Sequence, residues 1–217
     1  MTTPLRFGRA ALAAVAFAAY LLLAHHTTAS GQHPTLGALL AVVPYMAAAL
    51  AMAARARHRG FALALWALGA ALLWRQWPVV EARFEWVYLI QHVGTFGLLA
   101  IGFGRSLGGE PMITRFARLV HGAELAPPLV RYTRGATAAW ALFFTAMTTA
   151  SLLLFFGGPL PLWSLLVNIL TPLLVALMFA AEFLVRRLLL PPGLRTGLVE
   201  SVRACMHAGR RASPPAA

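Results

Sequence analysis

Residues 137–156 read TAAWALFFTAMTTASLLLFF, a run of consecutive positions without a charged side chain. A bilayer core about 30 Å thick needs roughly 20 helical residues, so this stretch predicts a membrane-spanning helix. Arg131 and Arg134 stand shortly before it, and the next arginine after it is Arg186. Arginines gathered at one end of an apolar helix indicate that this end faces the cytoplasm.

Five further apolar stretches accompany this one. They cover residues 10–24, 36–54, 61–77, 86–103 and 162–185. The first stretch is short, and the third contains Arg75 near its end, where a long side chain can reach the membrane interface. We expect an all-α, polytopic membrane protein with six transmembrane helices.

The basic residues give this bundle an orientation. All 18 are arginine, and most lie in clusters that follow every second apolar stretch. The clusters are Arg6 with Arg9, then Arg55, Arg57 and Arg59, then residues 105–134, and finally residues 186–211. The alternate connections hold only Arg75 and Arg83. This asymmetry predicts that both termini are cytoplasmic, an N-in/C-in topology.

Composition excludes other classes of protein. A hydrophobic content of 60% with 11% charged residues is not that of a soluble domain. The net charge of +12 does not indicate nucleic-acid binding, because the arginines flank apolar segments instead of covering one folded face. The single cysteine, Cys205, excludes an internal disulfide and two-cysteine metal or redox sites. We expect no metal and no cofactor.

The expected organisation is a transmembrane domain over residues 1–186, with a cytoplasmic insertion at 104–134, and a cytoplasmic tail over 187–217. Outer connections are expected at 25–35, 78–85 and 157–161, with Trp74 and Trp163 among the interfacial aromatics. One alternative stays open: the N-terminus is a signal peptide cleaved near Thr27-Thr28-Ala29, which would leave five helices.

The insertion between the fourth and fifth membrane segments predicts a short amphipathic helix. Pro111 suits its first position and Gly122 its end. One face carries the apolar residues Met112, Ile113, Phe116, Leu119 and Val120. Arg115 and Arg118 lie opposite, so the helix is expected in the inner headgroup layer, with its arginines near lipid phosphates. With neighbouring Arg131 and Arg134, this basic surface is also a candidate docking site for an acidic cytosolic partner.

Several polar side chains fall at membrane depth in the outer half of the predicted bundle. They are Gln91, His92, Thr95, Thr148, Asn168 and Thr171. Above this layer stand Arg75, Glu81, Arg83 and Glu85. One hypothesis is a polar pocket centred on His92 and Asn168. The alternative, which we favour, is a set of interhelical hydrogen bonds.

Glu182 is the only acidic residue inside an apolar stretch. It stands four residues before Arg186, which is the spacing of a helical ion pair. Nucleophile elbows, phosphate loops and paired aspartates are absent from the sequence, and no catalytic residue stands out.

Three stretches carry a resemblance to a known family. They are EPMITRFARLVHG at 110–122, PPLVRYTRGATAAWALFF at 127–144, and WSLLVN at 163–168 together with MFAAEFLVRR at 178–187. The pattern resembles small, uncharacterised proteobacterial inner-membrane proteins encoded in gene clusters for aryl-polyene pigments of the xanthomonadin type. The resemblance covers the C-terminal half of the chain. It implies a multi-pass protein of the bacterial inner membrane, and an acidic acyl carrier protein or cytosolic pathway enzymes as partners beside membrane lipids.

Three functions follow as expectations. The first is a non-catalytic accessory protein of aryl-polyene or related acyl-lipid biosynthesis, which docks pathway components at the membrane. The second is an integral-membrane acyl or glycosyl transferase that uses the layer around His92 and Asn168. The third is a subunit of a lipid or polyene transporter.

Overall fold

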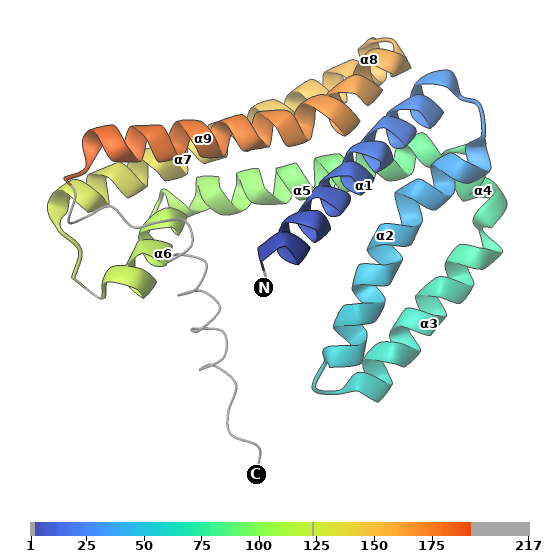
Figure 1. Cartoon of the computed structure of the whole chain (residues 1–217), viewed down its shortest axis with the longest axis horizontal. Coiled ribbons are helices and arrows are strands. Elements are labelled where there is room, and N and C mark those ends of the chain that lie inside the picture. Colours follow the sequence, from blue (N-terminus) through green and yellow to red (C-terminus); the bar gives the residue numbers. More distant parts are fainter. Residues whose placement is uncertain (1–2, 123, 192–217) are drawn as a thin grey trace. The chain divides into compact units, whose positions relative to one another are not determined.

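The computed structural model describes residues 3–122 and 124–191, and within these ranges the chain is helical without any strand. The helices, shown in Figure 1, are α1 (Thr3–Ser30), α2 (Pro34–Arg55), α3 (Arg59–Arg75), α4 (Trp77–Ala82), α5 (Phe84–Ser106), α6 (Met112–His121), α7 (Pro127–Gly157), α8 (Leu160–Ser164) and α9 (Thr171–Leu189). A π-helix, η1 (Leu165–Leu170), connects α8 to α9.

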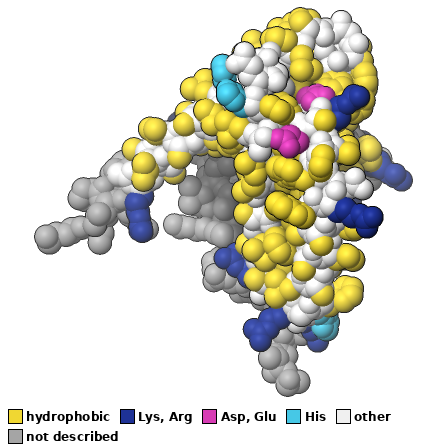
Figure 2. All heavy atoms as spheres, turned by 90° about the vertical axis from the view of Figure 1, so that its right-hand side faces the viewer, with side chains coloured by type: hydrophobic (Ala, Val, Ile, Leu, Met, Phe, Trp, Pro, Cys, Tyr) yellow, Lys and Arg dark blue, Asp and Glu magenta, His cyan; other side chains and the backbone are white. Residues whose placement is uncertain are grey.

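Five helices are long and apolar enough to cross a membrane. They are Gly8–Ser30 of α1, the whole of α2, α5 and α7, and the helix Leu160–Leu189 that runs through α8, η1 and α9. Large apolar side chains such as Leu12, Leu98 and Leu142 are more than two-thirds exposed, as expected of surfaces that contact lipid. Figure 2 shows hydrophobic side chains over most of one face. The protein is therefore a multi-pass membrane protein.

The sixth expected span corresponds to α3. This helix has 17 residues and is the shortest of the apolar helices predicted to cross. It lies beside α2 as the second arm of a hairpin (Figure 1), and Trp66 Nε1 on α3 donates a 3.0 Å hydrogen bond to the Met46 carbonyl on α2.

The described residues gather into two compact units. Unit 1 contains residues 3–94 and Ala150–Pro172, and unit 2 contains Thr95–Thr149 and residues 173–191. In unit 1, small residues of α1 and α2 pack against large ones of α5 and α8. The buried cluster consists of Ala24, Ala38, Ala41, Val42, Phe84, Tyr88, Leu89 and Trp163.

Two contacts in unit 1 show how α2 and α5 run. Gly37 near the start of α2 faces the ring of Phe84 at the start of α5; a Cβ on Gly37 would lie 2.5 Å from Phe84 Cε2. One helical turn further along α2 and two turns further along α5, Gln91 Nε2 donates a 2.8 Å hydrogen bond to the Ala41 carbonyl. The two helices therefore run parallel, with their N-terminal ends together.

Unit 2 is held together by aromatic packing between helices. Trp140 on α7 is buried and lies 4.7 Å, centroid to centroid, from Phe179 on α9. Phe144, one turn further along α7, lies 5.9 Å from Phe96 and 5.2 Å from Phe103, both on α5. The two pairs of Phe144 are edge-to-face, and such pairs contribute about 0.5–1.5 kcal/mol each beyond the area that they bury.

The connections that were expected on the outer side are shorter than the sequence predicts. α1 continues to Ser30, because the hydroxyls of Thr27 and Ser30 hydrogen-bond to carbonyls of the preceding turn. Much of the expected connection at 78–85 is the short helix α4. Trp163, expected at the interface, is fully buried and donates a 3.0 Å hydrogen bond to Ser151 Oγ, whereas Trp74 is 78% exposed.

Candidate functional site

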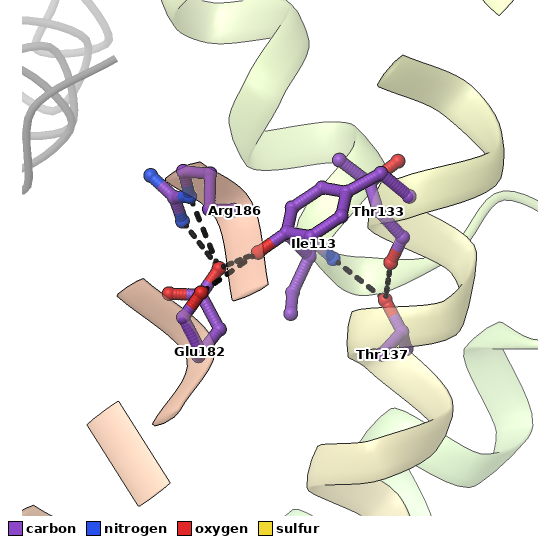
Figure 3. A network of polar contacts seen from close by, with 6 residues as sticks. Ile113, Thr133, Thr137, Glu182 and Arg186 are labelled. Atoms are coloured by element: carbon purple, nitrogen blue, oxygen red, sulfur yellow. Dashed lines mark hydrogen bonds and ion pairs between the residues drawn. The ribbon is translucent and has the colours of Figure 1, made fainter. Parts of the chain in front are cut away.

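A polar network joins α7 to α9 in unit 2. Tyr132 Oη donates a 2.5 Å hydrogen bond to Glu182 Oε1, and Arg186 Nη2 donates to the same oxygen at 2.6 Å. Figure 3 shows Arg186 and Glu182 facing each other on α9. The side chains of Glu182 and Arg186 are only 8% and 17% exposed, so this is a largely desolvated ion pair. The ion pair predicted from the i, i+4 spacing is confirmed. The hydrogen bond from Tyr132 to Glu182 was not predicted.

Beside this network, a groove of about 640 Å³ runs between the two helices. One wall is the face of α7 from Pro128 to Ala139, with Gly135 and Ala136 at its centre. The other wall comes from α9 and its C-terminal end, with Met178, Ala181 and Val185. Because small residues stand on both walls, their short side chains do not fill the space between the helices. Arg131 and Tyr132 lie near the Pro128 end of the groove, and Glu182 lies part way along its α9 wall; the other lining residues are apolar or small.

The insertion between α5 and α7 forms the short helix α6 and rests on α7. Thr114, nearly fully buried, hydrogen-bonds to Thr133 through their hydroxyls at 2.8 Å. The backbone N–H of Ile113 donates to Thr137 Oγ1 at 3.2 Å, and Thr137 in turn donates to the Thr133 carbonyl (Figure 3). The N–H of Met112 donates to Ser106 Oγ. Two N–H groups of the first turn, which have no partner within a helix, are thereby satisfied, and this fixes α6 against its neighbours.

Because α6 contacts these threonines of α7, its surface has three distinct faces. The face with Thr114 meets α7, so the predicted apolar face does not point at the protein. Phe116 and Leu119 on that apolar face are 44% and 52% exposed. The third face carries Arg115 and Arg118, whose side chains are about half exposed.

The four docking candidates all lie in unit 2, and three of them have a partner there. Arg118 Nε contacts Glu110 at 2.8 Å, and Arg115 Nε lies 3.8 Å from the same carboxylate. Arg134 Nη2 donates a 2.8 Å hydrogen bond to the Leu107 carbonyl. Arg131 is exposed and lines the groove. The segment 104–134 that carries them holds five arginines and two glutamates, Glu110 and Glu124, so its net charge is +3 (five minus two).

Of the six pocket candidates, the structure brings His92 and Thr171 together in unit 1. His92 is buried, and its Nε2 lies 3.1 Å from Thr171 Oγ1. The one hydroxyl proton of Thr171 is donated to the Leu166 carbonyl at 2.7 Å, so Nε2 of His92 is the donor of the pair. Gln91, a third candidate, donates the hydrogen bond to the Ala41 carbonyl on α2 that is described above.

Asn168 enters a second set of bonds in unit 1. Its Nδ2 donates to the carbonyl and to Oγ of Ser164, each at 3.2 Å. Ser164 Oγ is also 3.0 Å from His25 Nδ1 on α1. His25 therefore lies within a helix and against a neighbour, and not in a loop as predicted. Asn168 sits in the π-helix η1, a rare geometry that is frequent at functional sites and that no sequence signal indicated.

The other two pocket candidates, Thr95 and Thr148, belong to unit 2. Thr95 is exposed, and Thr148 donates a hydrogen bond to the Phe144 carbonyl of its own helix. The six residues therefore do not form one network within either unit. We interpret the buried bond between His92 and Thr171 as an interhelical connection. Asn168 bonds to Ser164 of its own helix, and a ligand pocket around these residues stays a prediction.

The charged residues expected above this layer lie around α4 in unit 1. Glu81 accepts a hydrogen bond from the Thr35 hydroxyl at the start of α2. Arg75 ends α3 and Arg83 follows α4, and both are exposed. Glu85 lies in the first turn of α5, where a carboxylate is favoured by the helix dipole. These interactions orient the helix ends and do not enclose a site.

Fold and site together define a helical, multi-pass membrane protein with a polar network and a groove between two of its helices. Comparison with known protein families, with curated proteins and with solved structures finds no match.

Proposed function

We propose that this protein is an accessory protein of the bacterial inner membrane that docks an acidic acyl carrier protein through the basic surface of unit 2. By basic surface we mean Arg115, Arg118, Arg131 and Arg134. The observation that carries the proposal is the seating of α6 on α7 by Thr114 and Thr133, because it holds two of the arginines on a fixed, exposed helix.

The chemistry of the proposed partner follows from charge and from the sequence resemblance. The net charge of +3 attracts an acidic protein, and such attraction speeds association and selects partners. The resemblance to proteins of aryl-polyene gene clusters indicates which acidic partner to test, because acyl carrier proteins of acyl-lipid synthesis are acidic.

The proposal includes a topology of six crossings with both termini cytoplasmic. In unit 1, α2 and α5 run parallel with their N-terminal ends together, as the Gly37–Phe84 and Ala41–Gln91 contacts require. If α2 crosses from the outer to the inner side, the chain must return before α5 begins. α3 is the helix between them, and Arg75 at its end can extend its reach to the headgroups. This topology also puts the basic surface on the cytoplasmic side, with α6 in the inner headgroup layer and Phe116 and Leu119 towards lipid.

Capture of purified acyl carrier protein by the detergent-solubilised protein tests the docking function. The double variant Arg115→Glu/Arg118→Glu is expected to lower the amount captured on the order of tenfold, since like charges then face each other. The matched control is Arg55→Glu/Arg57→Glu, which makes the same charge change at the α2–α3 connection and leaves capture unchanged. Equal capture by the wild type and by the Arg115/Arg118 variant would contradict the proposal.

A further inference from the structure

The groove between α7 and α9 has the dimensions of a site for one extended chain. Its α7 wall runs from Pro128 to Ala139, eleven residues on, which at 1.5 Å per residue is about 17 Å. Its volume of about 640 Å³ lies in the range of roughly 300–1,000 Å³ that is usual for ligand sites. An alkyl chain would fit an elongated, mostly apolar groove of this volume.

Charge distinguishes the two ends of this groove. Glu182 is compensated, because Arg186 and Tyr132 both donate to its Oε1. Arg131 also lines the groove, is exposed, and takes part in no ion pair among the described residues. The groove therefore presents an uncompensated cation near one end. The other end, at Ala139 and Met178, has apolar walls.

The polar end is also the end that carries most arginines of this unit. Pro128 and Arg131 begin α7, while Leu189 and Leu190 follow Arg186 and Arg187 at the end of α9. An amphiphile placed with its anion at Arg131 would direct its chain towards Ala139, along the helices. A phospholipid of the leaflet on this side has that orientation, and anionic headgroups are attracted to arginines at the membrane surface.

We propose that the α7–α9 groove is a binding site for an anionic phospholipid, with one acyl chain between the helices and the headgroup phosphate at Arg131. This goes beyond docking, because it assigns a specific lipid site to unit 2 whether or not a carrier protein binds there. An acyl chain can enter because four lining residues are small: Gly135, Ala136, Ala139 and Ala181. Arg131 favours a headgroup with a negative charge.

Photo-crosslinking to the full-length protein tests the site. The probe is phosphatidylglycerol with a diazirine in its acyl chain, and labelled peptides are identified by mass spectrometry. Labels are expected on the groove residues of α7 and α9, and unlabelled phosphatidylglycerol should compete about fivefold better than phosphatidylcholine, the effect of one arginine near a membrane surface. Labels spread evenly over the apolar helices would overturn the proposal, as would equal competition by the two lipids.

Adjacent residues supply matched variants. Ala139→Leu fills the groove and is expected to abolish most of the labelling there, whereas Ala138→Leu, also exposed on α7 but outside the groove, leaves it unchanged. If Ala139→Leu does not fold, Ala181→Leu against Ala180→Leu makes the same comparison on α9. Labelling that persists in the filled variants would overturn the site.

The headgroup contact has its own control. Arg131→Gln should remove the preference for phosphatidylglycerol, while Arg187→Gln, outside the groove and stacked on Phe183, should keep it. A preference that survives Arg131→Gln overturns the role of this arginine. If crosslinks join two copies of the protein through the groove in place of lipid, the occupant is a second copy and the proposal is wrong.

Discussion

Tyr132 on α7 donates a 2.5 Å hydrogen bond to the carboxylate of Glu182 on α9. The oxygen that receives this bond also receives Arg186 Nη2 at 2.6 Å. The bond connects two helices through residues that are fifty positions apart in the sequence, and the charged group that accepts it is nearly buried. Bonds to charged groups are stronger than neutral ones and contribute about 1.5–3 kcal/mol.

Removing the carboxylate should therefore cost more than removing the tyrosine hydroxyl. In Glu182→Ala, the guanidinium of Arg186 stays largely buried without its partner, and we expect the free energy of unfolding to fall by about 3 kcal/mol. Tyr132→Phe leaves the ion pair in place and should cost about 1.5 kcal/mol. Reversible unfolding of the purified protein in mixed micelles measures both. The double variant Glu182→Ala/Arg186→Ala removes the unpaired charge and should recover part of the loss; a double variant less stable than Glu182→Ala would speak against this explanation.

Gly37 has no room for a side chain. Its Cα faces the buried ring of Phe84, and an added Cβ would meet three ring carbons at 2.5–2.7 Å. Gly37→Ala should force α2 and α5 apart and lower stability by about 1–3 kcal/mol, the usual cost of overpacking. Thermal denaturation with Gly69→Ala as control measures this effect. Nothing lies within 4 Å of a Cβ on Gly69, so that variant should be neutral or slightly stabilised. Equal melting temperatures for the two variants would show that the contact is loose.

The sequence was sufficient to predict the long apolar helices, but not the short helix α4 or the contacts between helices. Apolar length fixes a membrane helix almost alone, so the stretch at 137–156 correctly placed the centre of α7. The pair of Glu182 and Arg186 followed from spacing within one helix. The partners of these residues on other helices, above all Tyr132, depend on helix rotation and on side-chain packing. No periodicity in the sequence indicates those.

The connections expected on the outer side were predicted with the wrong ends, and the cause is local. His25 and Thr27 look like loop residues because they are polar and follow an apolar stretch. Within α1, however, Thr27 hydrogen-bonds to its own helix, and His25 meets Ser164. Polar residues that find partners inside a helix do not end it. The π-helix around Asn168 is another feature that arises from packing and that the sequence does not signal.

His92 and Thr171 are expected to couple weakly. Interhelical hydrogen bonds of this kind contribute about 0.6 kcal/mol on average inside membranes. A double-mutant cycle with His92→Ala and Thr171→Val should therefore give a coupling free energy of about that size. A cycle between His92→Ala and Thr148→Val supplies the control, because Thr148 bonds to its own helix. Coupling near zero for both pairs would mean that the buried bond adds nothing to stability.

The proposed crossing of α3 depends on the shortest helix of the proposed topology. Labelling of single cysteines in whole cells can test it. In a Cys205→Ser background, His58→Cys places a thiol between α2 and α3, and Val79→Cys places one on α4, where Val79 is 60% exposed. If α3 crosses, a membrane-impermeant thiol reagent labels the cysteine at 79 in intact cells and the cysteine at 58 only after the membrane is opened. Since both residues are exposed, the difference reports the side of the membrane and not burial. Labelling of both cysteines in intact cells, or of neither, would place them on one side. In that case α3 does not cross, and the parallel arrangement of α2 and α5 in unit 1 would have to be wrong as well.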